Sequence, residues 1–207
     1  MSAPSTREVG LDAAPSARIG PNAITRVAEA LTERHGAAVE RQVFAKAELS
    51  HHLAQPPEAM VPEADVVALH RAVRSVLVRA DADALMRDAG ERTARYLLAR
   101  RIPKPAQAVL AALPARLAAR LLLALIAKHA WTFAGSARLR VFPGRPARVV
   151  FEGSPFAAVP AAEAPVCGFY VGTFETLFQT LVHPAARAEE TGCAAAGAPV
   201  CTLRLSW

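Results

Sequence analysis

The spacing of apolar residues changes once along this 207-residue chain, and that change limits the folds it can adopt. Before Gly135, apolar side chains recur at every third or fourth position, which is the spacing of amphipathic helices. After Gly135, short apolar runs and alternating segments follow, which are typical of strands. Helices first and a few antiparallel strands later indicate an α+β domain, in which N-terminal helices precede a small antiparallel sheet packed with helices.

Residues that stop helices divide the first part of the chain. Gly36, the Pro56-Pro57 pair, Pro103 and Pro114 each follow a segment with helical spacing. Proline cannot continue a helix, and glycine commonly ends one. We therefore expect helices over residues 22–36, 38–49, 62–77 and 81–101, and two shorter helices on either side of Pro114 that carry the chain to residue 131.

The second part of the chain begins with a hairpin signal. Pro143 and Gly144 separate two apolar segments, residues 139–142 and 149–151. After them we expect a loop, a helix and a final strand, over residues 155–165, 169–182 and 200–207.

The ends of these segments suggest the domain organisation. Residues 1–18 are rich in Ser, Pro and Ala without periodicity and are expected to form a disordered leader. Residues 19–207 are expected to form one domain, mainly helical over 19–134 and containing the sheet, a helix and a metal site over 135–207.

Charge and hydropathy limit the partners. The net charge of +6 comes almost wholly from arginine, which suits anionic partners such as a phosphorylated ligand, a membrane surface or the propionates of a tetrapyrrole; an arginine-rich composition without specific meaning is the alternative. The arginines are dispersed and no DNA- or RNA-binding motif accompanies them, so nucleic acid is not expected. The most apolar run, residues 117–127, contains Arg120 and is too short for a transmembrane span, although a peripheral membrane contact stays open.

The cysteines carry the strongest chemical signal. Three cysteines and no hydrophobic leader near Met1 favour a reducing, cytoplasmic compartment, where thiols bind metals rather than form disulfides. Cys167, Cys193 and Cys201, with Glu190 three positions before Cys193, offer the four ligands of a closed tetrahedral zinc site. The alternative is that these cysteines are ordinary buried thiols.

Four segments resemble a known family. They are "IGPNAITRVAEAL", "RTARYLLARRIPKPAQ", "LPARLAARLLLALIAKHAWTFAGS" and the terminal Glu190-x-x-Cys193-x7-Cys201. Together they are similar to the bacteriochlorophyll 4-vinyl reductase family of purple phototrophic bacteria, from about Ile19 to Trp207. The C-terminal half is also similar to the 4-vinyl reductase domain in aromatic-responsive transcription activators, whose zinc ligands correspond to Cys167, Glu190, Cys193 and Cys201. The resemblance implies a structural zinc and, from the related sensors, a homodimer.

Candidate residues for binding a tetrapyrrole lie mainly at the end of the most apolar segment. Trp131 and Phe133 could stack on a macrocycle, His129 could coordinate a central Mg²⁺, and Lys128 could pair with a propionate. His70, on the apolar stripe of the third helix, is a second candidate ligand. The hydroxyl of Tyr96 is a further candidate. Each of these side chains would serve equally well as ordinary core packing.

The residues leave the enzymatic question open. A vinyl reductase needs a hydride or electron source, yet the sequence shows no nicotinamide, flavin or iron–sulfur motif and no acid–base pair. We therefore expect a protein of bacteriochlorophyll biosynthesis that binds a Mg-porphyrin or divinyl protochlorophyllide and assists its delivery or reduction by pathway enzymes, in the cytoplasm near the photosynthetic membrane. An 8-vinyl reductase (4-vinyl in older numbering) and a small-molecule-sensing or assembly module are the alternatives.

Overall fold

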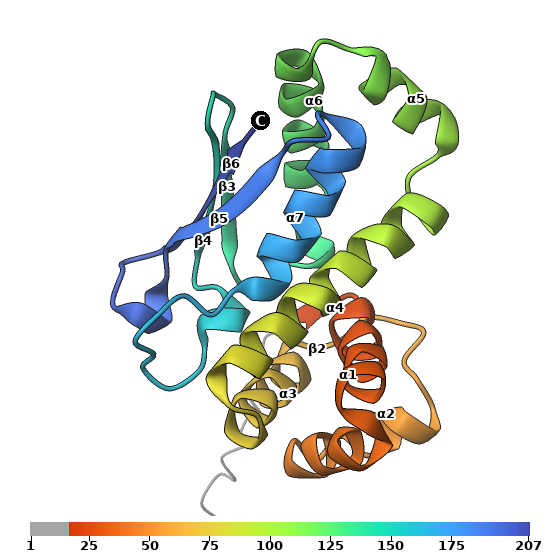
Figure 1. Ribbon diagram of the computed structural model, residues 1–207, viewed down its shortest axis with the longest axis vertical. Coiled ribbons are helices and arrows are strands. Elements are labelled where there is room, and N and C mark those ends of the chain that lie inside the picture. Colours follow the sequence, from red (N-terminus) through yellow and green to blue (C-terminus); the bar gives the residue numbers. More distant parts are fainter. Residues whose placement is uncertain (1–16) are drawn as a thin grey trace, which may run out of the picture.

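A computed structural model describes residues 17–207, and it has a helical part and a sheet part (Figure 1). The helices are α1 (Asn22–Lys46), α2 (His51–Ala54), α3 (Glu63–Val76), α4 (Arg79–Arg100), α5 (Lys104–Ala112), α6 (Ala115–Lys128) and α7 (Gly168–Leu181). The strands are β1 (Arg18–Ile19), β2 (Val61–Pro62), β3 (Arg138–Phe142), β4 (Ala147–Glu152), β5 (Arg187–Gly192) and β6 (Cys201–Ser206). Three short 3-10 helices are η1 (Ala130–Thr132), η2 (Pro155–Ala157) and η3 (Ala194–Ala196).

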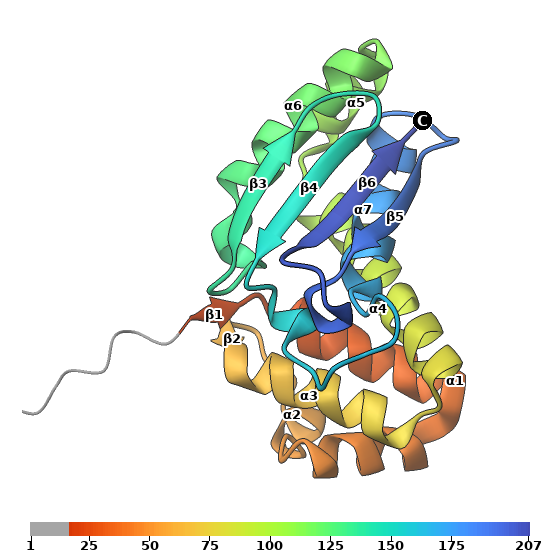
Figure 2. The same cartoon turned by 90° about the vertical axis from the view of Figure 1, so that its left-hand side faces the viewer.

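The four-stranded antiparallel sheet has the order β3-β4-β6-β5. Helices α6 and α7 cover one of its faces (Figure 2). The side chains on that face, such as Phe151, Leu203 and Leu205, are fully buried, whereas Arg148 and Arg204 point to the other face and are exposed. This alternation is what a sheet covered on one side requires.

Glycines allow α4 and α7 to approach closely at the centre of the molecule. A Cβ atom on Gly90 would lie 2.1 Å from the carbonyl oxygen of Phe169, and one on Gly172 would lie 2.2 Å from that of Arg87. The Thr173 hydroxyl donates a hydrogen bond across the contact to the carbonyl of Gly90. The crossing therefore places the N-terminus of α7 against α4.

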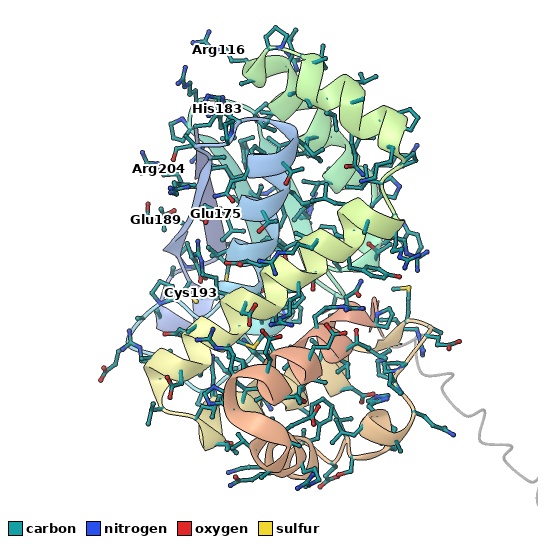
Figure 3. All side chains as sticks on the ribbon, turned by 45° about the vertical axis from the view of Figure 1, so that its right-hand side comes forward. Arg116, Glu175, His183, Glu189, Cys193 and Arg204 are labelled. Carbon is teal, nitrogen blue, oxygen red and sulfur yellow. The ribbon has the colours of Figure 1, made fainter. Side chains whose placement is uncertain are left out.

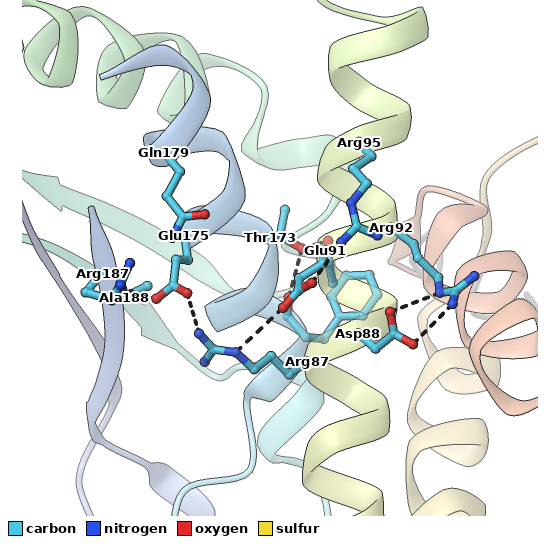
Figure 4. Close-up of polar contacts among 12 residues, drawn as sticks. Arg87, Asp88, Glu91, Arg92, Arg95, Thr173, Glu175, Gln179, Arg187 and Ala188 are labelled. Atoms are coloured by element: carbon cyan, nitrogen blue, oxygen red, sulfur yellow. Dashed lines mark hydrogen bonds and ion pairs between the residues drawn. The ribbon is translucent and has the colours of Figure 1, made fainter. Parts of the chain in front are cut away.

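A buried carboxylate joins three elements beside this crossing (Figure 4). Glu175 on α7 accepts a hydrogen bond from the guanidinium of Arg87 on α4 and another from the backbone N–H of Ala188 on β5. The Glu175 side chain is only 12% exposed. Because charged hydrogen bonds hold a buried carboxylate firmly, this contact fixes β5 relative to both helices.

The structure confirms the α+β fold and the expected helices and hairpin, with differences at some ends. Gly36 interrupts α1 as expected, with φ 82° and ψ 162°, although the helix resumes directly and runs to Lys46. Among the described residues, no helix is long and apolar enough to cross a membrane.

The N-terminal prediction needs one correction. Most of the expected leader, residues 1–18, falls outside the described residues, but Arg18 is described and forms strand β1. It pairs with Pro62, and its guanidinium donates to the carbonyl of Met60. Arg18 therefore belongs to the fold, because pairing with a distant segment holds it where its own sequence has no strand signal.

Candidate metal centre and binding residues

The four predicted metal ligands come from three segments at one end of the sheet. Cys167 directly precedes α7, Glu190 lies in β5, Cys193 follows β5 and Cys201 begins β6. An irregularity in the β5–β6 pairing between Glu190 and Gly192 brings the chain around to η3. Gly197, with φ 90°, then lets the chain turn back toward β6. Cys193 is labelled at the lower end of the sheet in Figure 3.

These four side chains converge on one point. One ligand atom from each lies within 4.8 Å of all the others. The Sγ atoms of Cys167 and Cys201 are 3.7 Å apart. Two thiolates about 2.3 Å from one ion, at the tetrahedral angle, lie about 3.8 Å from each other. The cluster therefore has the dimensions of a tetrahedral zinc site.

The carboxylate is held with one oxygen free. The backbone N–H of Cys167 donates to Oε2 of Glu190 at 2.7 Å, whereas the buried Oε1 has no hydrogen-bond partner among the described residues. A buried oxygen without a partner is costly. A metal ion at the centre of the cluster would satisfy Oε1, so the donor set fits a zinc ion.

Proton sharing perturbs the acidity of the whole cluster. Hydrogen bonding with the Cys167 thiol lowers the pKa of Cys193 to about 4 and also lowers the pKa of Cys201. The same bonds raise the pKa of Cys167, and burial raises the pKa of Glu190 to about 8. Since a cation would replace the shared protons, acid is expected to oppose metal binding.

The candidates at the end of α6 lie mostly on the surface. Lys128, His129 and Trp131 are exposed, and Trp131 has 65% of its surface accessible. His129 Nδ1 lies 2.8 Å from the carbonyl oxygen of Leu125, within the same helix end. Only Phe133 faces inward, where it contacts Tyr170 and other rings at edge-on angles.

The other two candidates lie elsewhere. Tyr96 on α4 is half-buried under the guanidinium groups of Arg26 and Arg101. His70 on α3 is 2% exposed, its ring lies edge-on to Phe156 at 5.2 Å, and neither ring nitrogen has a hydrogen-bond partner in the described part of the chain. Burial, with the charge of Arg74, lowers the pKa of His70 to about 3. Within the described residues, no hydrogen bond or ring contact joins any two of the six binding candidates.

An aromatic cluster beside His70 was not predicted. Phe151 stacks on Tyr170 at 4.2 Å, Phe156 stacks on Phe169 at 4.9 Å, and the Phe156 and Tyr170 rings meet edge-on at 4.7 Å. These rings come from β4, η2 and α7, so only the concentration of aromatic residues over 151–174 could have suggested the cluster.

Two open grooves were found among the described residues, and neither contains the six candidates. The larger, about 580 Å³, lies between α1 and the residues around His52, and the smaller, about 380 Å³, lies at the start of α3. The aromatic cluster itself is closely packed, so a ligand would enter it only after side chains move.

Known proteins identify the family. Residues 147–206, which include all four candidate ligands, match the 4-vinyl reductase domain. Two proteins named bacteriochlorophyll synthase 23 kDa chain, from Cereibacter sphaeroides and Rhodobacter capsulatus, are each 41% identical to this chain over 188 residues. The match covers 91% of this chain and 90% and 86% of theirs. The chain belongs to the bacteriochlorophyll synthase 23 kDa chain family. The resemblance seen in the sequence is thereby confirmed, and the family places the chain in bacteriochlorophyll biosynthesis.

A solved structure shares the fold of this 23 kDa family member. An Fe(II) unliganded H-NOX protein mutant from K. algicida superposes with a TM-score of 0.60 and 12% identity, over 91% of this chain and 96% of that one. At this identity the likeness concerns the fold alone. It extends beyond the 4-vinyl reductase domain to the N-terminal helices, since nearly the whole described chain superposes.

Proposed function

We propose that this chain binds a magnesium tetrapyrrole intermediate of bacteriochlorophyll synthesis and presents it to other enzymes of the pathway. The observation that carries the proposal is His70, a buried imidazole with no hydrogen-bond partner among the described residues, beside a cluster of aromatic rings. A buried polar group without a partner is rare and calls for an explanation. An incoming ligand that satisfies it supplies one.

The chemistry of His70 suits a magnesium ligand. Because its pKa is lowered to about 3, the ring is neutral near pH 7 and keeps a free lone pair. Flat aromatic faces favour stacking on a macrocycle, and Phe156, Phe169 and Tyr170 lie next to the imidazole. We propose that Phe156 and η2 move aside to admit the pigment.

We propose a structural role for zinc in the same protein. Cys167, Glu190, Cys193 and Cys201 would hold the ion, and four protein ligands leave no position for water or substrate. The ion would supply cross-linking rather than reaction chemistry. It would join the start of α7 to β5 and β6, behind the aromatic cluster to which α7 contributes Phe169 and Tyr170.

Titration of the full chain with Mg-protoporphyrin tests the proposal. We expect a shift of the Soret band for the unchanged protein and at least tenfold weaker binding for His70→Leu, which keeps an apolar side chain in the core. His129→Gln is the matched control and should bind normally. Metal-free protoporphyrin, which accepts no axial ligand, should bind both variants equally.

Two results would contradict the proposal. Absence of any Soret shift with the unchanged protein would rule out pigment binding. Normal binding by His70→Leu together with lost binding by His129→Gln would move the ligand to the end of α6. Incubation with divinyl protochlorophyllide and reduced nicotinamide tests the reductase alternative, because a carrier alone forms no product.

A further inference from the structure

Exposed apolar side chains gather on the hairpin formed by α5, α6 and η1. Seven large apolar side chains of the described residues are exposed, and five of them lie in this segment: Val109, Leu117, Leu121, Leu125 and Trp131. Leu117, Leu121 and Leu125 are spaced four residues apart, so they form one line along α6. The opposite face of α6, with Ala118, Leu122 and Leu123, is buried in the fold.

Unpaired cations flank this line. Lys104, Arg116, Arg120 and Lys128 are exposed, and none forms an ion pair or a side-chain hydrogen bond within the described part of the chain. Arg116 and Arg120 lie one position before Leu117 and Leu121, and therefore on the adjoining strip of α6. Figure 3 shows Arg116 at the tip of the hairpin, at the far end of the molecule from α1.

The surrounding sequence offers these cations no counter-charge. Residues 92–151 hold 12 of the 24 arginines and lysines of the chain and none of its 18 acidic residues. The rest of the chain therefore carries 12 basic and 18 acidic residues, a net charge of −6 against +12 for this segment. The positive charge is concentrated where the apolar side chains are exposed.

We propose that this hairpin surface, made of the apolar line and its flanking cations, docks on a lipid bilayer with anionic headgroups. An apolar strip with leucine and tryptophan beside arginine and lysine is the composition of helices that lie in a membrane interface. The leucines and Trp131 enter the headgroup region while the cations contact lipid phosphates. A second copy of this chain fits less well, because a symmetric contact would bring like charges together.

Flotation of the full chain with vesicles tests this docking. We expect binding to vesicles of phosphatidylcholine with phosphatidylglycerol, little binding to phosphatidylcholine alone, and release in 0.5 M salt, a concentration of about 0.5 M being enough to screen surface charges. A blue shift of Trp131 fluorescence should accompany binding in a Trp207→Phe background, since the chain has 2 tryptophans.

Matched variants separate the surface from general basicity. The Arg116→Gln/Arg120→Gln pair should weaken binding by about 25-fold, about fivefold for each cation removed from the lipid surface. The Leu117→Ser/Leu121→Ser pair should weaken it by at least tenfold. Arg34→Gln/Arg41→Gln on α1 removes the same charge, and Val78→Ser removes an equally exposed apolar side chain elsewhere. Both controls should bind like the unchanged protein.

Three outcomes would overturn the proposal. The first is no binding to the anionic vesicles. The second is equal weakening by the α1 pair, which would mean diffuse attraction of a basic protein. The third is a dimer in sedimentation velocity that the Leu117→Ser/Leu121→Ser pair dissociates without any lipid binding, which would assign the surface to a second copy.

Discussion

The sulfur atoms of Cys167 and Cys201 lie 3.7 Å apart although 34 residues separate the two cysteines in the chain. One belongs to the entry of α7 and the other to the first position of β6. An ion bound by both would close this long segment, and its removal would leave four acidic groups crowded together. Metal content and stability are therefore expected to change together.

The purified chain is expected to contain about one zinc per molecule. Glu190→Gln should lower the zinc content, measured by elemental analysis, and Glu189→Gln should not. Glu189 is the matched control because it is next in the chain but exposed, with Arg204 as its partner. Equal zinc content in all three proteins would show that Glu190 is not a ligand, and no zinc in the unchanged protein would reject the site.

Stability is expected to fall with acid in a way that depends on His70. Its pKa is about 3 in the fold against 6.5 for the free side chain, so between these values the unfolded chain binds the extra proton. Stability must therefore decrease as pH falls through this range, by about 2 kcal/mol between about pH 7 and pH 5. Urea unfolding should show this loss in the unchanged protein and in His183→Gln, but not in His70→Leu. An identical loss in His70→Leu would place the titrating group elsewhere.

Gly172→Ala is expected to disrupt the crossing of α4 and α7. The new Cβ would lie 2.2 Å from the backbone oxygen of Arg87, which cannot move without shifting the helix. We expect a loss of about 3 kcal/mol or more in the free energy of unfolding, or no folded protein. Gly168→Ala, whose nearest contact would be 3.3 Å, should lose about 1 kcal/mol. Similar thermal stability of the two variants would contradict the packing.

Glu175→Gln tests the buried carboxylate that joins α4, α7 and β5. The amide oxygen can still accept from Ala188, but the charge that attracts Arg87 is lost. Because Arg87 is partly exposed and its charge is screened, we expect a loss of about 1–2 kcal/mol in chemical unfolding. Glu189→Gln, whose ion pair is exposed, should stay within about 0.5 kcal/mol of the unchanged protein. Equal effects would mean that Glu175 contributes no more than a surface charge.

The helices and the β3–β4 hairpin could be predicted because their signals are local. Gly36, Pro103 and Pro114 stand at helix boundaries, and the turn residues Pro143 and Gly144 lie between β3 and β4. Strand β5, in contrast, contains Arg, Glu and Gly with little strand preference, and its conformation depends on pairing with β6. Strand β1 likewise exists through its pairing with β2.

The candidate metal ligands could be named from their types and from family resemblance, but their convergence could not. Spacing along the chain does not reveal that β6 lies beside β5, nor that Cys167 approaches Cys201. The expected pocket around Trp131 shows a second limit. An aromatic residue at the end of an apolar helix looks the same in sequence whether it faces the core or, as here, the solvent.

The position of β6 has a consequence for the order in which the chain is made. β6 lies between β4 and β5 in the sheet, yet all three other strands of that sheet precede it in the sequence. A nascent chain that has emerged from the ribosome only as far as Gly192 holds β5 without the strand it pairs with. Assembly of the sheet must therefore wait for residues 201–206, so the final fold forms late in translation rather than segment by segment.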